Sequence, residues 1–148
     1  MRKMLILFAL TIVMTMMLSI HSNAEAMYSS PHEDSRELQF QDMMMLFLLP
    51  YIDKAVSDYY SKLLTGSPNV YPYQVSVIKV ARMNRFRGFN FLITLEVSPV
   101  VGPPIRVGRD NLTFQVAPTV PNTVKLVKYE HLKTYELPPN WQHIIRRP

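Results

Sequence analysis

The chain has 148 residues, a formal net charge of +5 and no cysteine. This length accommodates one ordinary domain rather than two. Because there is no cysteine, the composition excludes disulfides, thiol redox chemistry and thiolate metal sites, and packing and hydrogen bonds must hold the fold together.

The charge is unevenly distributed along the chain. Residues 27–65 carry 3 basic and 6 acidic side chains, whereas residues 66–148 carry 11 basic and 4 acidic side chains. A basic second half favours anionic partners, such as lipid head groups or wall polymers. The alternative is that these charges only keep the surface solvated.

The N-terminus has the pattern of a secretory signal. Arg2 and Lys3 precede an apolar run from Met4 to Ile20, and Ala24-Glu25-Ala26 supplies small residues before a cleavage point. The pattern predicts a cleaved signal peptide over residues 1–26 and a secreted, extracytoplasmic mature chain. The alternative is an uncleaved N-terminal membrane anchor, since an apolar run of 17 residues reaches the lower limit for crossing a bilayer.

Helical patterns follow the signal. Ser30-Pro31-His32-Glu33 has the form of a capping box, and Ser35 is a second candidate for the N-cap. Apolar residues then recur at helical spacing from Leu38 to Leu63, interrupted by Pro50. Because proline lacks a backbone donor, residues 35–65 are predicted as either one kinked helix or a pair of helices.

The second half of the chain predicts strands. Alternating apolar positions mark strands from Val70 to Arg82, from Phe89 to Val97, from Leu112 to Val116 and from Val124 to Tyr129. Residues 98–108, which are rich in proline and glycine, are predicted as a loop between the second strand and the third.

The predicted fold is therefore α+β, with an N-terminal helix or kinked helix pair packed on a four-stranded antiparallel sheet. A single domain is expected over residues 27–133. Residues 134–148 include Pro138 and Pro139 and end in Arg146-Arg147-Pro148, and they are predicted as an extended, basic C-terminal tail.

Several segments of this domain together resemble one known family. They are Glu37–Leu49, Pro50–Tyr60 with its Pro-Tyr-Ile and Tyr-Tyr ends, the loop Val101–Pro104 and the strand Lys125–His131. Over residues 35–132 the chain resembles the bacterial domain-of-unknown-function family numbered 3888, found in small exported proteins of bacilli and their relatives. The resemblance implies export and a helix-plus-sheet domain, and it implies no activity, substrate or catalytic residue.

A basic and aromatic turn joins the first two predicted strands. Arg82, Arg85, Phe86 and Arg87 are the candidate binding residues, with Phe89 close behind. Such a turn can hold a phosphate-bearing polymer or rest on a lipid surface, and the alternative is a solvated turn. The segment matches no nucleic-acid-binding motif, so nucleic acid is not expected as a partner.

Other candidate residues lie on the helix and among the histidines. Asp42 falls on the apolar stripe, so it is either a pocket carboxylate or a boundary residue that is paired with an arginine or faces water. Met43-Met44-Met45 is either core or an adaptable docking surface. His32, His131 and His143 lack the spacing of a metal site, and no metal or cofactor is expected.

No nucleophile elbow and no phosphate-binding glycine loop is present in the sequence. The sequence therefore favours an exported, non-catalytic binding module at the cell envelope, with an anionic envelope component or a protein as its partner. Membrane contact is expected only through the signal segment or by weak surface binding. The alternatives are a small enzyme with a pocket between helix and sheet, using Asp42 or His131, and a domain that docks its apolar helix on a protein.

Overall fold

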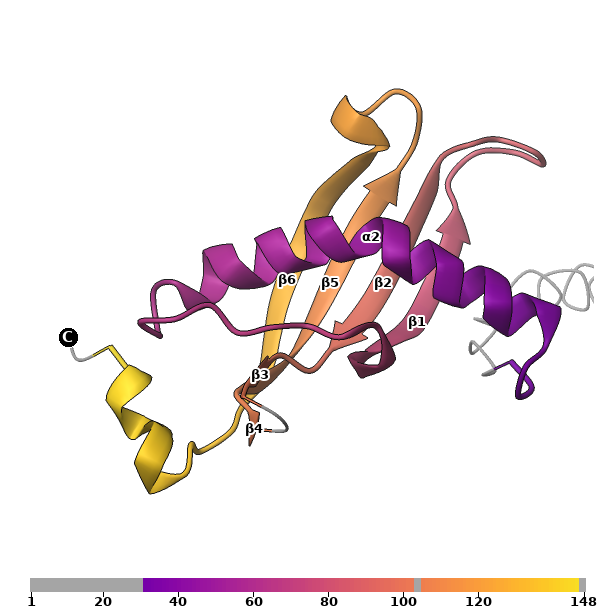
Figure 1. Ribbon diagram of the computed structural model, residues 1–148. Coiled ribbons are helices and arrows are strands. Elements are labelled where there is room, and N and C mark those ends of the chain that lie inside the picture. Colours follow the sequence, from indigo (N-terminus) through magenta and orange to yellow (C-terminus); the bar gives the residue numbers. More distant parts are fainter. Residues whose placement is uncertain (1–30, 103–104, 147–148) are drawn as a thin grey trace, which may run out of the picture.

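The computed structural model describes residues 31–102 and 105–146, so the predicted signal and Ser30 lie outside the described residues. One long helix crosses a four-stranded antiparallel sheet, which confirms the predicted α+β class (Figure 1). The main elements are helix α2 (Arg36–Tyr60) and strands β1 (Val75–Arg82), β2 (Phe91–Val97), β5 (Gly108–Val116) and β6 (Val124–Thr134).

Helix α2 is one continuous helix rather than a pair. It begins after Ser35, whose hydroxyl accepts a hydrogen bond from the Leu38 N–H at 3.2 Å. Pro50 lies inside the helix; the buried residues Leu48 and Ile52 on either side hold this turn against the sheet, because tertiary packing outweighs local propensity. Among the described residues, no helix combines the length and the apolar character needed to cross a bilayer.

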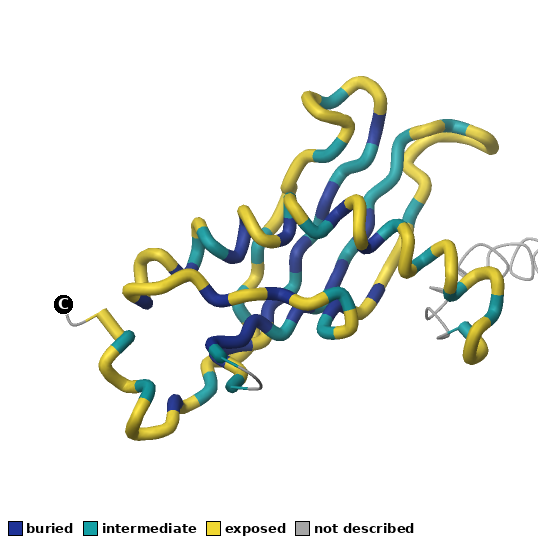
Figure 2. Tube along the Cα trace, viewed as in Figure 1, coloured by how far each residue is buried: buried dark blue, intermediate teal, exposed yellow. Residues whose placement is uncertain are grey.

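The sheet has the order β1-β2-β5-β6, with every neighbouring pair antiparallel. Alternate residues of β2 point to opposite faces, so Ile93, Leu95 and Val97 are buried while Thr94 and Glu96 are half-buried. Helix α2 covers the first face and leaves the second face open, as the burial along the trace shows (Figure 2).

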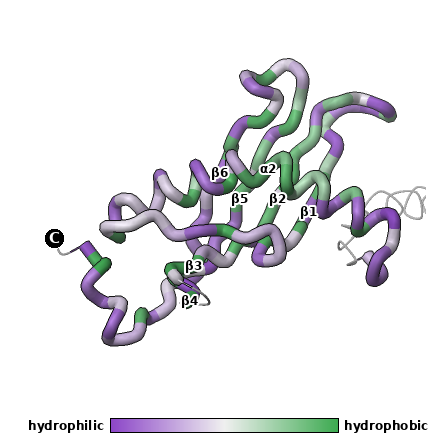
Figure 3. Tube along the Cα trace, in the orientation of Figure 1, coloured by the Kyte–Doolittle hydropathy of each residue, from purple (hydrophilic) through white to green (hydrophobic). Residues whose placement is uncertain are grey.

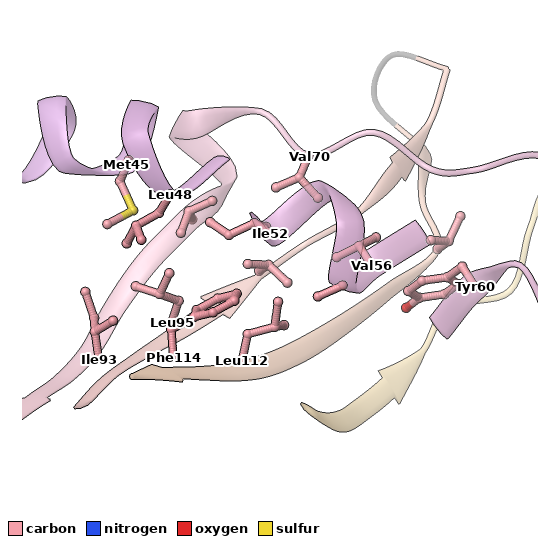
Figure 4. Close-up of a cluster of buried hydrophobic side chains, with 14 of the residues drawn as sticks. Met45, Leu48, Ile52, Val56, Tyr60, Val70, Ile93, Leu95, Leu112 and Phe114 are labelled. Atoms are coloured by element: carbon pink, nitrogen blue, oxygen red, sulfur yellow. The ribbon is translucent and has the colours of Figure 1, made fainter. Parts of the chain in front are cut away.

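The core lies between helix and sheet. Hydrophobic residues are concentrated where α2 crosses β1, β2 and β5 (Figure 3). Each fully buried aliphatic or aromatic side chain of this kind contributes about 1.5–3 kcal/mol to stability. The side chains that meet there are Met45, Leu48, Ile52, Val56 and Tyr60 from the helix and Ile93, Leu95, Leu112 and Phe114 from the sheet (Figure 4).

The predicted loop between the second and third main strands has structure of its own. Strands β3 (Val100–Val101) and β4 (Ile105–Arg106) form a two-stranded antiparallel ribbon. Gly102 has φ +61°, a conformation that favours glycine, and the Trp141 ring packs so closely that a Cβ at Gly102 would lie 2.7 Å from it.

The C-terminal segment folds back instead of running extended as predicted. Leu137 is buried, and the 3₁₀ helix η3 (Pro139–Ile144) leads to a β-bridge between Leu64 and Ile145. Arg146 then donates from its backbone N–H to the Leu63 carbonyl at 2.8 Å and from Nε to the Leu64 carbonyl at 2.9 Å. Leu137, Trp141 and Ile144 pack on the core and follow one another at helical spacing, but Pro138 and Pro139 between them favour extended backbone, which is why the sequence predicts a tail.

Candidate functional site

The carboxylate of Asp110 is the charged group buried most deeply among the described residues, with none of its surface exposed. The Tyr60 hydroxyl donates a hydrogen bond to Oδ2 at 2.9 Å, and His131 Nδ1 lies 2.6 Å from Oδ1. A carboxylate in such a position is tolerated because each oxygen has a partner. The end of α2, strand β5 and strand β6 therefore meet at one charge.

The same histidine continues the hydrogen bonding toward solvent. A carboxylate only accepts, so Nδ1 of His131 carries the hydrogen toward Asp110. Nε2 lies 2.7 Å from the Thr134 hydroxyl and, in the neutral ring, accepts from it. This carboxylate–imidazole–hydroxyl order is the arrangement in which an imidazole acts as a base toward a hydroxyl.

Thr134 also lines an open groove of about 510 Å³ between the ends of α2 and β6 and the C-terminal segment. Most of its walls are apolar and include Leu63, Leu64, Leu137 and Ile145. The groove can therefore bind the apolar part of a ligand next to the Thr134 hydroxyl.

Three tyrosines complete the surroundings of Asp110: Tyr60, which is buried, and Tyr59 and Tyr129, which are half-buried. The Tyr59 ring stacks on the Tyr129 ring at 4.7 Å and on the His131 ring at 5.3 Å. Burial, reinforced by the negative charge of Asp110, raises the pKa of both Tyr60 and Tyr129 far above the ordinary tyrosine value. Both phenols therefore stay neutral, and the Tyr129 hydroxyl is buried without a hydrogen-bond partner among the described residues.

Backbone irregularities bring this cluster together. The pairing of β5 with β6 shifts between Arg109 and Asp110, which sets His131 opposite Asp110. Gly108 leaves room for Tyr60, since a Cβ at that position would lie 2.0 Å from the Tyr60 hydroxyl. Asp110 is not among the site residues predicted from the sequence. It lies two residues before Leu112, the first residue of the third predicted strand, so extending the alternation of that strand would have placed it on the core face.

Asp42, the carboxylate considered from sequence, is exposed on α2 and lines none of the three pockets described. The methionine cluster is divided, with Met45 buried in the core and Met43 exposed. Exposed apolar residues on this half of the helix include Phe40, Leu46 and Phe47, of which Phe47 is 77% exposed.

The four basic and aromatic residues predicted to bind a partner lie together at the β1–β2 hairpin tip. Arg82 braces this tip: its guanidinium lies 4.5 Å from the centre of the Phe91 ring and donates to the Gly88 carbonyl. Arg85 and Arg87 are exposed and form no ion pair with any described residue. Phe86 between them is 92% exposed.

Within residues 31–102 and 105–146, no group of three histidine or carboxylate side chains is placed to hold a metal ion. His32 and His143 are exposed, and His143 stacks with Trp141 rather than joining the Asp110 cluster. His131 is the histidine that the structure brings into a polar network.

Comparison with protein families gives one match, over residues 40–133, to the model described as Protein of unknown function (DUF3888). Comparisons with curated proteins and with solved structures give no match. The matched segment includes Tyr60, Asp110 and His131 and ends one residue before Thr134.

We predict that Gly108→Ala destabilises the domain by about 2–3 kcal/mol, because the added methyl group forces the Tyr60 hydroxyl away from Asp110 and leaves a buried carboxylate oxygen without its donor. Gly66→Ala is the matched control, since nothing lies within 4 Å of a Cβ there. Urea unfolding of both variants measures the difference. Equal stabilities would show that the contact between Tyr60 and Asp110 does not constrain the fold.

The raised pKa values of Tyr60 and Tyr129 predict a loss of stability in alkali. Above about pH 10 the unfolded chain releases phenolic protons that the folded chain retains, so the free energy of unfolding falls as the pH rises. Tyr129→Phe should flatten this fall, because it removes one of the two phenols whose pKa is raised in the folded chain. Tyr73→Phe, at an exposed position, should leave the pH dependence as in the wild type. Denaturant unfolding at pH 7, 9.5 and 11 tests this, and an unchanged slope in Tyr129→Phe would contradict it.

Proposed function

The chain belongs to the DUF3888 family of proteins of unknown function, and we propose that it is an exported, non-catalytic module that docks on an anionic lipid surface of the cell envelope. The family match confirms the resemblance inferred from the sequence. Export is supported by the signal pattern of residues 1–26. The observation that carries the docking proposal is the exposed, basic and aromatic tip of the β1–β2 hairpin.

The tip has the composition of an interfacial membrane contact. Phe86 and Phe89 are exposed side chains that can enter the boundary between head groups and acyl chains. Arg85 and Arg87 stand beside them, free to attract anionic lipid head groups, while Arg82 keeps the tip rigid. Rigidity matters because ordering a flexible loop on binding would reduce the affinity.

A second group of exposed apolar residues lies on α2. Phe40, Met43 and Phe47 recur at helical spacing on the first half of the helix. The hairpin tip and the first turns of α2 lie toward the same end of the molecule in Figure 1. The described part of the chain begins at this end with Pro31 (Figure 1).

We predict that residues 27–148 cosediment with vesicles containing anionic phosphatidylglycerol and much less with vesicles of phosphatidylcholine alone. Each arginine near an anionic surface contributes about 1 kcal/mol, so Arg85→Gln with Arg87→Gln should weaken binding roughly 30-fold. Phe86→Ser should weaken it at least tenfold, and high salt should act like the arginine variant.

The control variants make the same kinds of substitution at exposed positions away from the hairpin tip. Lys62→Gln with Lys125→Gln removes the same charge, and Tyr73→Ser removes an aromatic ring of similar exposure. If the controls weaken binding as much as the tip variants, the surface is not at the hairpin. If binding survives high salt and depends on Phe47 alone, the apolar helix docks on a partner by another mechanism.

A second candidate function is acyl transfer, favoured by the hydrogen-bonded order of Asp110, His131 and Thr134 beside an apolar groove. In that reaction Thr134 Oγ1 bonds to an ester carbonyl carbon, its proton passes to His131 Nε2 and then to the leaving alcohol, and water hydrolyses the resulting acyl-enzyme. This candidate corresponds to the small enzyme using His131 that the sequence leaves open as an alternative.

For this candidate, we predict that a fluorophosphonate probe labels Thr134 and that p-nitrophenyl esters are hydrolysed. Thr134→Val should abolish labelling, and His131→Gln should reduce turnover roughly 10²- to 10⁴-fold through loss of the base. Thr65→Val is the control for an exposed hydroxyl elsewhere on the chain. Absence of labelling, with ester hydrolysis equal in all variants, would assign the network to stability alone.

A further inference from the structure

A second groove lies on the open face of the sheet, at the end opposite the hairpin tip. It has a volume of about 450 Å³, and its floor includes Ser76 at the start of β1 and Glu96 and Ser98 at the end of β2. Its lining is predominantly polar, in contrast to the apolar groove beside Thr134. The volume is within the range of small-ligand sites.

Two arginines provide the positive charge of this groove. Arg106, on the short strand β4, is exposed, and its guanidinium has no ion pair or hydrogen-bond partner among the described residues. Arg109, on β5, is held only loosely, with its Nε 3.8 Å from the Glu96 carboxylate. With two guanidinium groups against one carboxylate, the lining has an excess of one positive charge and retains free donors for an anionic group.

Three tyrosines provide aromatic surfaces beside these donors. Tyr71 and Tyr73 flank Pro72 in a 3₁₀ turn, and their rings stack with centres 5.4 Å apart and planes 3° apart. The Gln74 side chain accepts from the Tyr71 backbone N–H at 3.2 Å, which fixes the turn. Tyr73 is 81% exposed, and Tyr135 lies on the groove as well.

The surface of this groove is both apolar and rich in hydrogen-bonding groups. The tyrosine rings supply flat apolar faces, and the guanidinium, serine hydroxyl and Gln74 amide groups supply donors and acceptors. A sugar ring has the same mixture of apolar faces and polar edges, and a carboxylate or phosphate on it would match the arginines. We propose that this groove is a binding site for acidic saccharides, with Arg106 and Arg109 holding the anionic group and Tyr71 and Tyr73 carrying the ring. This site is independent of the hairpin tip, and neither proposal requires the other.

The test is calorimetric titration of the full-length chain, kept in a nonionic detergent, with trigalacturonate, maltotriose and inorganic phosphate. Trigalacturonate should bind, maltotriose should bind at least tenfold more weakly because it lacks the charge, and phosphate should bind at least tenfold more weakly because it lacks the ring. Arg106→Gln and Tyr73→Ala should each weaken trigalacturonate binding at least tenfold. Both residues are exposed, so neither change should affect folding.

Lys125→Gln is the control, because it removes the same charge at an exposed site outside the groove. Absence of trigalacturonate binding, or equal weakening by Arg106→Gln and Lys125→Gln, would overturn the proposal. Phosphate binding as strong as trigalacturonate binding, unaffected by Tyr73→Ala, would also overturn it, because the groove would then be a simple anion site. The groove variants do not alter the hairpin, so vesicle binding should remain unchanged in them.

Discussion

The structure depends on how a negative charge is accommodated in its interior. Asp110 stands on β5 beneath the end of α2, and its two oxygens take partners from Tyr60 and His131. Because removing either partner would leave a buried carboxylate oxygen without a hydrogen-bond donor, the helix end and β6 are held in one position relative to β5. The apolar groove and the docking site of the C-terminal segment are both formed around that junction.

The sheet separates the two proposed contacts of the molecule. Strands β1 and β2 carry the hairpin tip at one end and the groove with Arg106 at the other. A rigid sheet of this kind would keep a ligand in the groove away from the surface that the tip contacts. Part of the charge excess of the second half of the sequence lies at these two places, which have different neighbours: exposed phenylalanines at the tip and stacked tyrosines in the groove.

Much of the architecture could be predicted from the sequence because it follows from periodicity. Apolar residues at helical and at alternating spacing predict the helix and the four main strands, and Pro50 accounts for the prediction of a kinked or divided helix. The Asp110 network could not be predicted, because it joins residues 50 and 21 positions apart and depends on a shift in strand pairing. The docking of the C-terminal segment is not predicted either, because Pro138 and Pro139 favour extended backbone even though Leu137, Trp141 and Ile144 follow helical spacing.

The bridge between Leu64 and Ile145 has a consequence for the timing of folding. A chain that emerges from its N-terminus presents α2 first, with its apolar side uncovered, and the residues that close its end come last. Asp110 gains its hydrogen bond only after His131 has emerged, and Leu64 forms its β-bridge only after Ile145, which emerges later still. The domain therefore completes its packing only after residues as far as Ile145 have emerged, and the end of α2 stays partly uncovered until then.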